Sequence, residues 1–216
     1  MIVTIDGPAG AGKSTVARAL AERLGFRFLD TGAMYRVVAL AAVKRGLDCD
    51  ASDELADLAE AITIKFDGDR VLLDGQDVAE TIRTSEITAL VRPVADNVRV
   101  RELLVQLQQR IGQSGNIVTE GRDQGTVAFP NAQCKIFLTA SPDERARRRV
   151  RDLESQGENP SFEEVLAQQT KRDREDETRS VGRMVKADDA VEVLTDGKSF
   201  VEVVDQLEEI VRSGAR

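Results

Sequence analysis

The sequence contains no histidine and no tryptophan, and it has only two cysteines. Without imidazole, neither a Ser-His-Asp nor a Cys-His nucleophile system can form, and histidine metal sites are excluded as well. Cys49 and Cys134 are too few and too far apart for a zinc knuckle, so we expect two free thiols. These absences exclude most hydrolases with a nucleophilic triad and most zinc enzymes.

Aromatic residues are also scarce, at 4%, which disfavours a base-stacking platform for single-stranded nucleic acid. The 38 acidic residues outnumber the 30 basic ones, and the net charge of −8 disfavours duplex nucleic acid and anionic membranes. The longest purely apolar run, Val37–Val43, is far shorter than the ~20 residues of a membrane span. The N-terminal residues show no basic segment or signal core. We therefore expect a cytoplasmic protein that binds neither nucleic acid nor a membrane.

The pattern of apolar residues predicts an α/β fold. With 216 residues, the chain has the length of one large domain or of one domain with an insertion. Short apolar segments alternate with helical patterns, which indicates a central parallel sheet covered by helices. Strands of this sheet are predicted at 2–5, 26–29, 116–119, 135–138 and 190–194. Helices are predicted at 14–24, 33–44, 52–61, 84–111 (with a kink or junction at Pro93), 142–156, 161–179 and 199–211.

Residues 62–78 show a different pattern. Ile62–Phe66 alternates with period two, and Asp67-Gly68-Asp69 has the composition of a hairpin turn. Two further short segments follow, Val71–Leu73 and Gln76–Val78. This spacing predicts a small antiparallel sheet of two or three strands, inserted between helices.

A phosphate-binding motif lies between the first predicted strand and the first predicted helix. The pattern G-x-x-x-x-G-K-[ST] is matched by Gly7, Pro8, Ala9, Gly10, Ala11, Gly12, Lys13 and Ser14. Glycines let the backbone N–H groups turn inward around a phosphate, and the helix N-terminus adds a partial positive charge. Lys13 can reach the β- and γ-phosphates, and the Ser14 hydroxyl can ligate Mg²⁺. The motif predicts a nucleoside triphosphate site but leaves the fate of the phosphate open.

The rest of the chain narrows the class of P-loop protein. The N-K-x-D and D-x-x-G sequences of switch GTPases are absent. Motor proteins are normally larger and carry surfaces for partners or nucleic acid. A small phosphotransferase fits better, and such an enzyme needs a second site for the phosphate acceptor.

Two segments are candidates for that second site. Asp30–Arg36 follows the second predicted strand; Thr31 is expected to cap the next helix, and Arg36 to project toward the acceptor phosphate. Glu120–Val127 follows the strand near residue 119. Charged groups at the carboxyl end of a parallel strand lie at the mouth of the site in open α/β sheets, so this loop is expected to face the acceptor.

Four segments between Ile5 and Arg179 occur in a characteristic order: IDGPAGAGKST, DTGAMYR, EGRDQGTVAFP and KRDREDETR. Together they resemble the bacterial cytidylate kinases, a family in the nucleoside monophosphate kinase group of P-loop proteins. The resemblance implies a P-loop three-layer α/β/α fold with a helical lid. It also implies a phosphotransferase of the EC 2.7.4 type that transfers the γ-phosphate of ATP to CMP or dCMP, with Mg²⁺ as cofactor. ATP and CMP or dCMP are the expected partners, and the protein is expected to be a monomer.

The resemblance also assigns roles to individual residues. Gly7 through Thr15 would hold the ATP phosphates, and catalysis would depend on Lys13, Arg122 and Arg179. The acceptor site would comprise Thr31, Arg36, Arg101, Arg122, Asp123, Arg172, Asp176 and Arg179. Within it, Arg36, Arg122 and Arg179 would grip the phosphate. Arg101 and Asp123 would read the cytosine, while Arg172 and Asp176 would contact the ribose or help to close the site.

In this interpretation the chain is one kinase domain with three parts. The core comprises residues 1–32, 112–141 and 186–216, and the acceptor-binding region is 33–111, with the small sheet at about 62–80. Residues 142–185 form a lid and the helices that contact the acceptor. Five arginines of the lid (Arg145, Arg147, Arg148, Arg149 and Arg151) surround a helix axis, so only one or two are expected to face a ligand.

Several alternatives remain open at this point. The acceptor could instead be UMP or shikimate, or the chain could be a regulatory protein that hydrolyses ATP slowly. Either Asp6 or Glu120 could order Mg²⁺ through water. Arg92 stands where the family often has a small hydroxyl residue near the base, which leaves the strength of base selectivity open.

Overall fold

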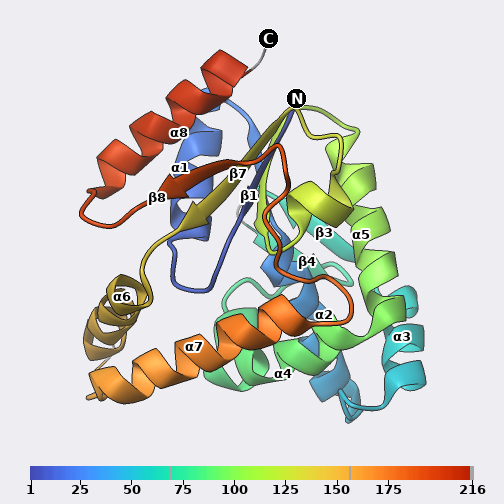
Figure 1. The fold of residues 1–216 in the computed structure, drawn as a ribbon. Coiled ribbons are helices and arrows are strands. Elements are labelled where there is room, and N and C mark those ends of the chain that lie inside the picture. The colour runs from blue at the N-terminus through green and yellow to red at the C-terminus, as the bar shows by residue number, and fades with distance from the viewer. Residues whose placement is uncertain (69, 156, 215–216) are drawn as a thin grey trace. The chain divides into compact units, whose positions relative to one another are not determined.

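A computed structural model describes residues 1–68, 70–155 and 157–214 (Figure 1). Asp69 of the predicted hairpin turn and Gln156 at the end of a predicted helix lie outside the described residues. The chain divides into two compact units. The first comprises Met1–Leu29 and Gly112–Arg216, and the second comprises Asp30–Ile111.

The first unit contains a five-stranded sheet in the order β2-β6-β1-β7-β8. Its strands are β1 (Ile2–Asp6), β2 (Arg27–Asp30), β6 (Ile117–Gly121), β7 (Cys134–Thr139) and β8 (Val191–Leu194). The central strand β1 pairs in parallel with β6 and β7, and β7 pairs in parallel with β8. Short, almost wholly apolar strands are typical of a sheet buried on both faces. The predicted α/β fold with a central parallel sheet is confirmed.

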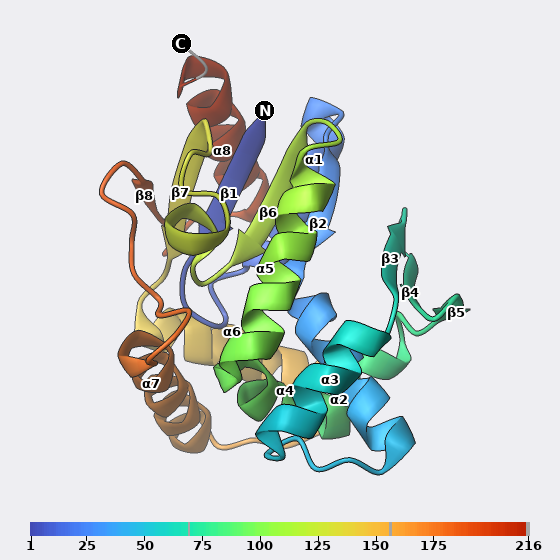
Figure 2. The same ribbon diagram turned by 90° about the vertical axis from the view of Figure 1, so that its right-hand side faces the viewer.

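Two helices of this unit pack against each other and on the sheet: α1 (Lys13–Leu24) and α8 (Phe200–Gly214) (Figure 1). The apolar cluster that joins them to the strands includes Ile5, Leu20 and Leu207, all of which are fully buried. Two further helices, α6 (Pro142–Ser155) and α7 (Phe162–Thr178), pack against each other (Figures 1 and 2). A short π-helical turn, η2 (Gln124–Ala128), follows β6 and contacts β1.

The second unit has its own apolar core. It is built from α2 (Thr31–Arg45), α3 (Ser52–Ala61), the 3₁₀ turn η1 (Thr81–Arg83), α4 (Ser85–Asp96) and α5 (Val98–Gly112). Side chains buried in this core include Met34, Val38, Leu55, Ile82 and Val100. The unit also carries the predicted small antiparallel sheet, β3 (Ile64–Asp67), β4 (Arg70–Leu73) and β5 (Gln76–Asp77), which is visible in Figure 2. This prediction is confirmed, with three strands.

The prediction that Thr31 caps α2 is wrong. Asp30 occupies the N-cap in an extended conformation, and its Oδ1 atom accepts a hydrogen bond from the Ala33 N–H at 2.9 Å. Thr31 is the first residue of the helix itself. The second oxygen of Asp30 accepts from Arg83 at 3.1 Å. An aspartate at this position can serve both partners because its carboxylate has two acceptor oxygens.

The junction predicted at Pro93 lies four residues later. Pro93 is inside α4, and the break between α4 and α5 falls at Asn97. The Asn97 Oδ1 atom accepts from the Val100 N–H at 3.1 Å, while its Nδ2 donates to the Ser52 carbonyl at 2.7 Å. The side-chain hydrogen bonds of Asn97 therefore fix the start of the new helix.

None of the helices in the described ranges has both the length and the apolar character needed to cross a lipid bilayer.

Gly7 occupies the tightest point of the chain between β1 and α1. Its φ is +145°, and a Cβ atom at this position would lie 2.0 Å from the carbonyl oxygen of Leu138 in β7. Since β1 and β7 are paired neighbours, the obstructing atom belongs to the sheet backbone and cannot move independently. Only glycine fits here.

We expect Gly7→Ala to lower the free energy of unfolding by more than about 2 kcal/mol, because a backbone clash adds to an unfavourable φ. The matched control is Gly25→Ala, at φ +67° with nothing within 4 Å of its Cβ position. This control should lose only about 1 kcal/mol. Urea unfolding of both variants measures the difference, and equal losses would contradict the steric argument.

Candidate active site

The predicted phosphate-binding loop lies directly between β1 and α1. Gly12 occupies the N-cap of α1 in the left-handed conformation, with φ of 86°. Within the described part of the chain, no side chain caps this helix, so its first N–H groups remain directed at the loop. The Lys13 Nζ atom donates to the Pro8 carbonyl at 2.8 Å, and the side chain is buried. The loop therefore has the backbone geometry of an anion site.

A cavity adjoins the loop within the first unit. Its walls come from Gly10–Gly12, from Thr15 of α1, and from Arg148, Arg149, Thr195, Lys198 and Phe200. Phe200, at the start of α8, is 48% exposed although it is a large apolar side chain. The cavity thus extends from the loop along α6 toward the turn between β8 and α8.

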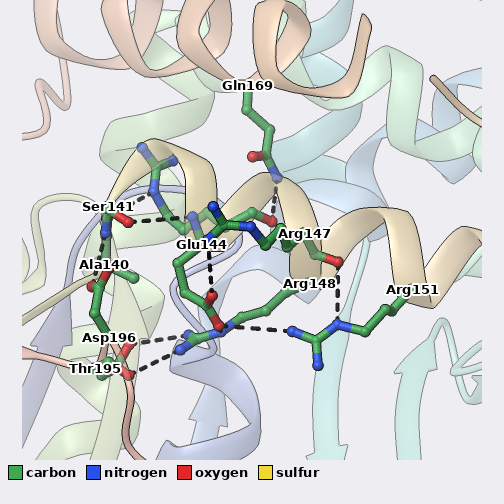
Figure 3. A network of polar contacts seen from close by, with 10 residues as sticks. Ala140, Ser141, Glu144, Arg147, Arg148, Arg151, Gln169, Thr195 and Asp196 are labelled. Carbon is green, nitrogen blue, oxygen red and sulfur yellow. Dashed lines mark hydrogen bonds and ion pairs between the residues drawn. The ribbon is translucent and has the colours of Figure 1, made fainter. Parts of the chain in front are cut away.

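Polar contacts connect α6 to that turn (Figure 3). The Glu144 carboxylate accepts from Arg148 Nε at 3.0 Å and lies within 3.7 Å of the Arg147 and Arg151 guanidinium groups. Arg148 also donates to the Thr195 hydroxyl and carbonyl, each at 3.0 Å. One glutamate therefore holds three of the five arginines, and Arg148 is oriented along the cavity wall.

Arg145 has a different environment, which the helical pattern did not predict. Its side chain is buried, and its guanidinium donates to the carbonyls of Ala140 and Ala9 at 3.1 and 3.0 Å. It also forms an ion pair with Asp173 of α7 at 2.5 Å. Arg145 thus connects α6, α7 and the phosphate-binding loop. It is a structural cation rather than one of the ligand-facing arginines that we predicted for this helix.

The structure brings three of the predicted acceptor residues together. Arg122 Nε donates to Asp176 Oδ2 at 2.7 Å, and Arg179 lies 3.1 Å from Asp176 Oδ1. Burial raises the pKa of Asp176, but Arg122, Arg179 and Arg172 outweigh this effect and hold it below its usual value. A single ionised carboxylate therefore keeps two guanidinium groups side by side, and Arg122 also donates to the Gly121 carbonyl at 3.3 Å.

Electrostatics link this arginine cluster to the loop. Burial and the positive charge of Arg122 lower the pKa of Lys13 to about 7, although Glu120 and Asp6 oppose the shift and Arg172 adds to it. Cations close enough to lower the pKa of a lysine are typical of a site built for an anion. Lys13, Arg122 and Arg172 are therefore parts of one positively charged site.

The structure distinguishes the two carboxylates that were candidates for ordering Mg²⁺. Glu120 accepts a hydrogen bond from the Ser14 hydroxyl at 2.9 Å, beside the loop. Asp6 instead accepts two backbone hydrogen bonds, from the N–H groups of Gln124 and Gly125, each at 2.8 Å. Oxygen donors such as Ser14 and Glu120 suit magnesium, which binds few protein ligands and keeps substrate phosphates and water as the others.

Asp6 has an unusual pKa, raised to about 6. The main cause is burial, and the charge of Asp123 adds to it. The hydrogen bonds from Gly125 and Gln124, and the charge of Lys13, act in the opposite direction without cancelling the effect.

Three of the acceptor candidates, Thr31, Arg36 and Arg101, belong to the second unit. Arg36 projects from the first turns of α2, and its buried Nε has no hydrogen-bond partner among the described residues. The Arg101 guanidinium lies over the Tyr35 ring, 5.6 Å from its centroid, and donates to the Ala95 carbonyl at 3.3 Å. Arg92 lies 3.6 Å from Asp96 on the same helix. Convergence of Arg36 and Arg101 with the arginines of the first unit stays a prediction.

A phosphate-binding loop after the first strand of a parallel sheet, with a buried lysine and an arginine cluster beside it, defines a P-loop phosphotransferase. Residues 3–213 match the family model described as cytidylate kinase. The chain belongs to the cytidylate kinase family.

Known proteins agree with this assignment. The chain is 52% identical to a cytidylate kinase of Rhodopirellula baltica over 98% of its own length and 93% of that protein. It is 48% identical to a bifunctional pantoate ligase/cytidylate kinase of a Synechococcus strain, covering 98% of this chain and 44% of that protein. A crystal structure of an uncharacterized protein from Eubacterium ventriosum has the same fold, with a TM-score of 0.54, 16% identity, and 99% and 98% of the two chains covered. The predicted family, fold class and phosphotransferase activity are confirmed.

The pKa of Asp6 predicts a pH effect on stability. Because the folded-state pKa lies above the model value of 3.8, the native protein binds more protons than the unfolded chain between pH 3.8 and about 6. The contribution of Asp6 is therefore greatest at low pH and is lost as pH rises through this window. Relative to Asp6→Asn, which cannot titrate, the wild type should lose about 2 kcal/mol between pH 4.5 and 7.5. Denaturant unfolding at both values tests this, and parallel pH dependence in the two proteins would refute it.

Proposed function

We propose that this chain transfers the γ-phosphate of ATP to CMP or dCMP, giving ADP and CDP or dCDP, through the residues identified above. The observation that carries the proposal is the cluster in which Asp176 holds Arg122 and Arg179, within electrostatic range of Lys13. A phosphotransferase of this kind must keep two anionic phosphate groups close together. A shared group of cations beside the phosphate-binding loop supplies the required charge.

On the ATP side, Gly7 through Thr15 would surround the phosphates with backbone N–H groups and the N-terminus of α1. The nucleoside would extend into the cavity beside α6 and the β8–α8 turn. Members of the nucleoside monophosphate kinase group generally use ATP with Mg²⁺. Ser14 would be the protein ligand, and Glu120, which accepts from its hydroxyl, would order the metal's water. When bound, the metal offsets charge on the phosphates.

On the acceptor side, Arg122 and Arg179 would bind the CMP phosphate, together with Arg36 from the second unit. An oxygen of that phosphate attacks the γ-phosphorus, and the bond from the γ-phosphorus to the bridging oxygen of ADP breaks. The nucleophile is already anionic, so the site needs no strong general base. Catalysis then depends on positioning and on cations that stabilise the equatorial oxygens in a loose transition state. Permanently charged, bidentate arginines are suited to this task.

Asp123 and Arg101 would read the cytosine, and Arg172 would contact the ribose or help to close the site. Cytosine presents an amino donor at position 4 and acceptors at N3 and O2. An ionised carboxylate can accept from the amino group, and a guanidinium can donate to the acceptors.

Thr31 is assigned to the same acceptor site. A lid formed by 142–185, a monomeric state and a cytoplasmic location also stay predictions.

The acceptor assignment predicts the behaviour of Arg179→Lys. Lysine keeps the charge but loses the bidentate geometry, so we expect the KM for CMP to rise at least about 10-fold and the KM for ATP to change little. Arg174→Lys, an exposed position on α7, is the control. A coupled ADP assay with CMP, dCMP, UMP, AMP and shikimate measures both. ADP production that no acceptor stimulates would identify a regulatory ATPase and overturn the proposal.

Discrimination between CMP and UMP tests the assignment of the residues that contact the base. UMP would place a carbonyl oxygen against Asp123 and a protonated N3 against Arg101, at about 1–3 kcal/mol for each unpaired group. We expect kcat/KM to favour CMP over UMP by roughly 10²–10³, less than the ~10⁴ of a rigid polar site, because Arg92 can add a donor near the base. Asp123→Asn should narrow this ratio, since an amide offers both donor and acceptor. Equal use of CMP and UMP by the wild type would exclude the cytosine assignment.

A further inference from the structure

Asp6 lies between two loops that serve different substrates in the proposed reaction. It is the last residue of β1, directly before Gly7, where the phosphate-binding loop begins. Its two oxygens accept hydrogen bonds at 2.8 Å from the N–H groups of Gln124 and Gly125. These two residues begin the η2 turn, immediately after Arg122 and Asp123. One carboxylate therefore joins the start of the ATP loop to the loop assigned to CMP.

We propose that Asp6 is a positioning residue for the acceptor, whose two hydrogen bonds set where Arg122 and Asp123 stand relative to the phosphate-binding loop. This inference rests on the proposed function, because it takes the acceptor roles of those two residues as given. Asp6 itself need not touch either substrate. It acts through the backbone of the turn that it holds.

Close contacts with β1 and β6 restrict the position of the η2 turn. A Cβ atom on Gly125 would lie 3.0 Å from Thr4 Oγ1 and 3.4 Å from Asp6 Oδ2, so the turn rests directly on β1. The Thr119 hydroxyl donates to the Gln124 side chain at 3.0 Å, which ties the turn to β6 as well. The position of the turn thus depends on a few short polar contacts, and the two made by Asp6 are to its backbone.

The chemistry of the carboxylate also indicates a role that a neutral residue could not fill. Asp6 is 5% exposed, and the charged groups facing it are Asp123 and Lys13. Backbone N–H groups bind an ionised acceptor more strongly than a neutral one. Asparagine has almost the same shape but would accept only one of the two hydrogen bonds and would direct an NH₂ group at the other N–H. Replacement by asparagine therefore displaces one side of the turn without opening a cavity.

The experiment compares steady-state kinetics of the wild type and Asp6→Asn. We expect the KM for CMP to rise at least about 10-fold, with the KM for ATP and the Mg²⁺ requirement changed by less than about 3-fold. Asp205→Asn provides the matched control, since Asp205 is a paired but exposed carboxylate on α8 of the same unit. It should behave as the wild type does. Amide exchange at Gln124 and Gly125 should be faster in Asp6→Asn without any substrate present.

A second variant moves the turn while Asp6 stays intact. Gly125→Ala places a methyl group 3.0 Å from Thr4 Oγ1 and 3.2 Å from Lys135 Cδ, which shifts the turn, so it should reproduce the selective rise in the KM for CMP. This variant also keeps the inference testable if Asp6→Asn does not fold. A wild-type KM for CMP in Gly125→Ala, or in a folded Asp6→Asn, would overturn it.

Arg122→Lys separates this inference from the proposed function. An unchanged KM for CMP in Arg122→Lys means that the acceptor assignment itself is wrong. A raised value there, with a normal value in Asp6→Asn, overturns the positioning role alone. If Asp6→Asn instead raises the KM for ATP and the Mg²⁺ requirement, Asp6 belongs to the nucleotide site and the inference is also overturned.

Discussion

The proposed active site depends on keeping like charges together at positions that are largely shielded from solvent. Arg122 and Arg179 would repel each other if they were alone, and Asp176 between them makes their proximity favourable. The carboxylate can do this because the surrounding cations keep it ionised despite burial. Burial and the charge of Arg122 lower the pKa of Lys13, and the nearby carboxylates of Glu120 and Asp6 offset this only in part. Bound phosphate would supply the missing negative charge, so affinity for anions follows from the arrangement of the cations.

The sheet determines where these charges meet. β1 and β6 are parallel neighbours, with Asp6 level with Gly121 in the pairing. The loops that follow them, one carrying Lys13 and the other Arg122, therefore start at the same edge. Residues more than 100 positions apart in sequence are brought together by backbone pairing, and Asp6 adds a side-chain connection at the same level. The proposed active site is thus built on two paired strands at the centre of the sheet.

The sequence was informative wherever function depends on local spacing. The phosphate-binding loop could be predicted because glycine, lysine and serine must stand at fixed intervals between a strand and a helix. Most elements were predicted to within a few residues, since buried strands and amphipathic helices have strong periodic patterns. The cap of α2 was assigned one residue too late, because Asp30 and Thr31 are both good caps and only backbone geometry distinguishes them.

Other features could not be predicted, because they depend on contacts between distant segments. Nothing in the local sequence distinguishes Arg145 from its neighbours in α6, yet it alone is buried against Ala9 and Asp173. The hydrogen bonds of Asp6 to the η2 turn and of Ser14 to Glu120 likewise could not be predicted without knowing which strands are neighbours. The roles of Arg36 and Arg101 in the acceptor site still rest on resemblance.

The contacts of Arg145 limit how the α6–α7 pair can move. Its guanidinium ties the first turn of α6 to the phosphate-binding loop and to α7, and Arg148 ties the next turn to Thr195. The first two turns of α6 are therefore held by contacts to the phosphate-binding loop, to α7 and to Thr195. For the predicted lid, these contacts favour movement beyond Arg148, in the stretch that leads to Ser155, over movement of the whole helix pair. Opening would then uncover the outer end of the cavity and leave the phosphate-binding loop in place.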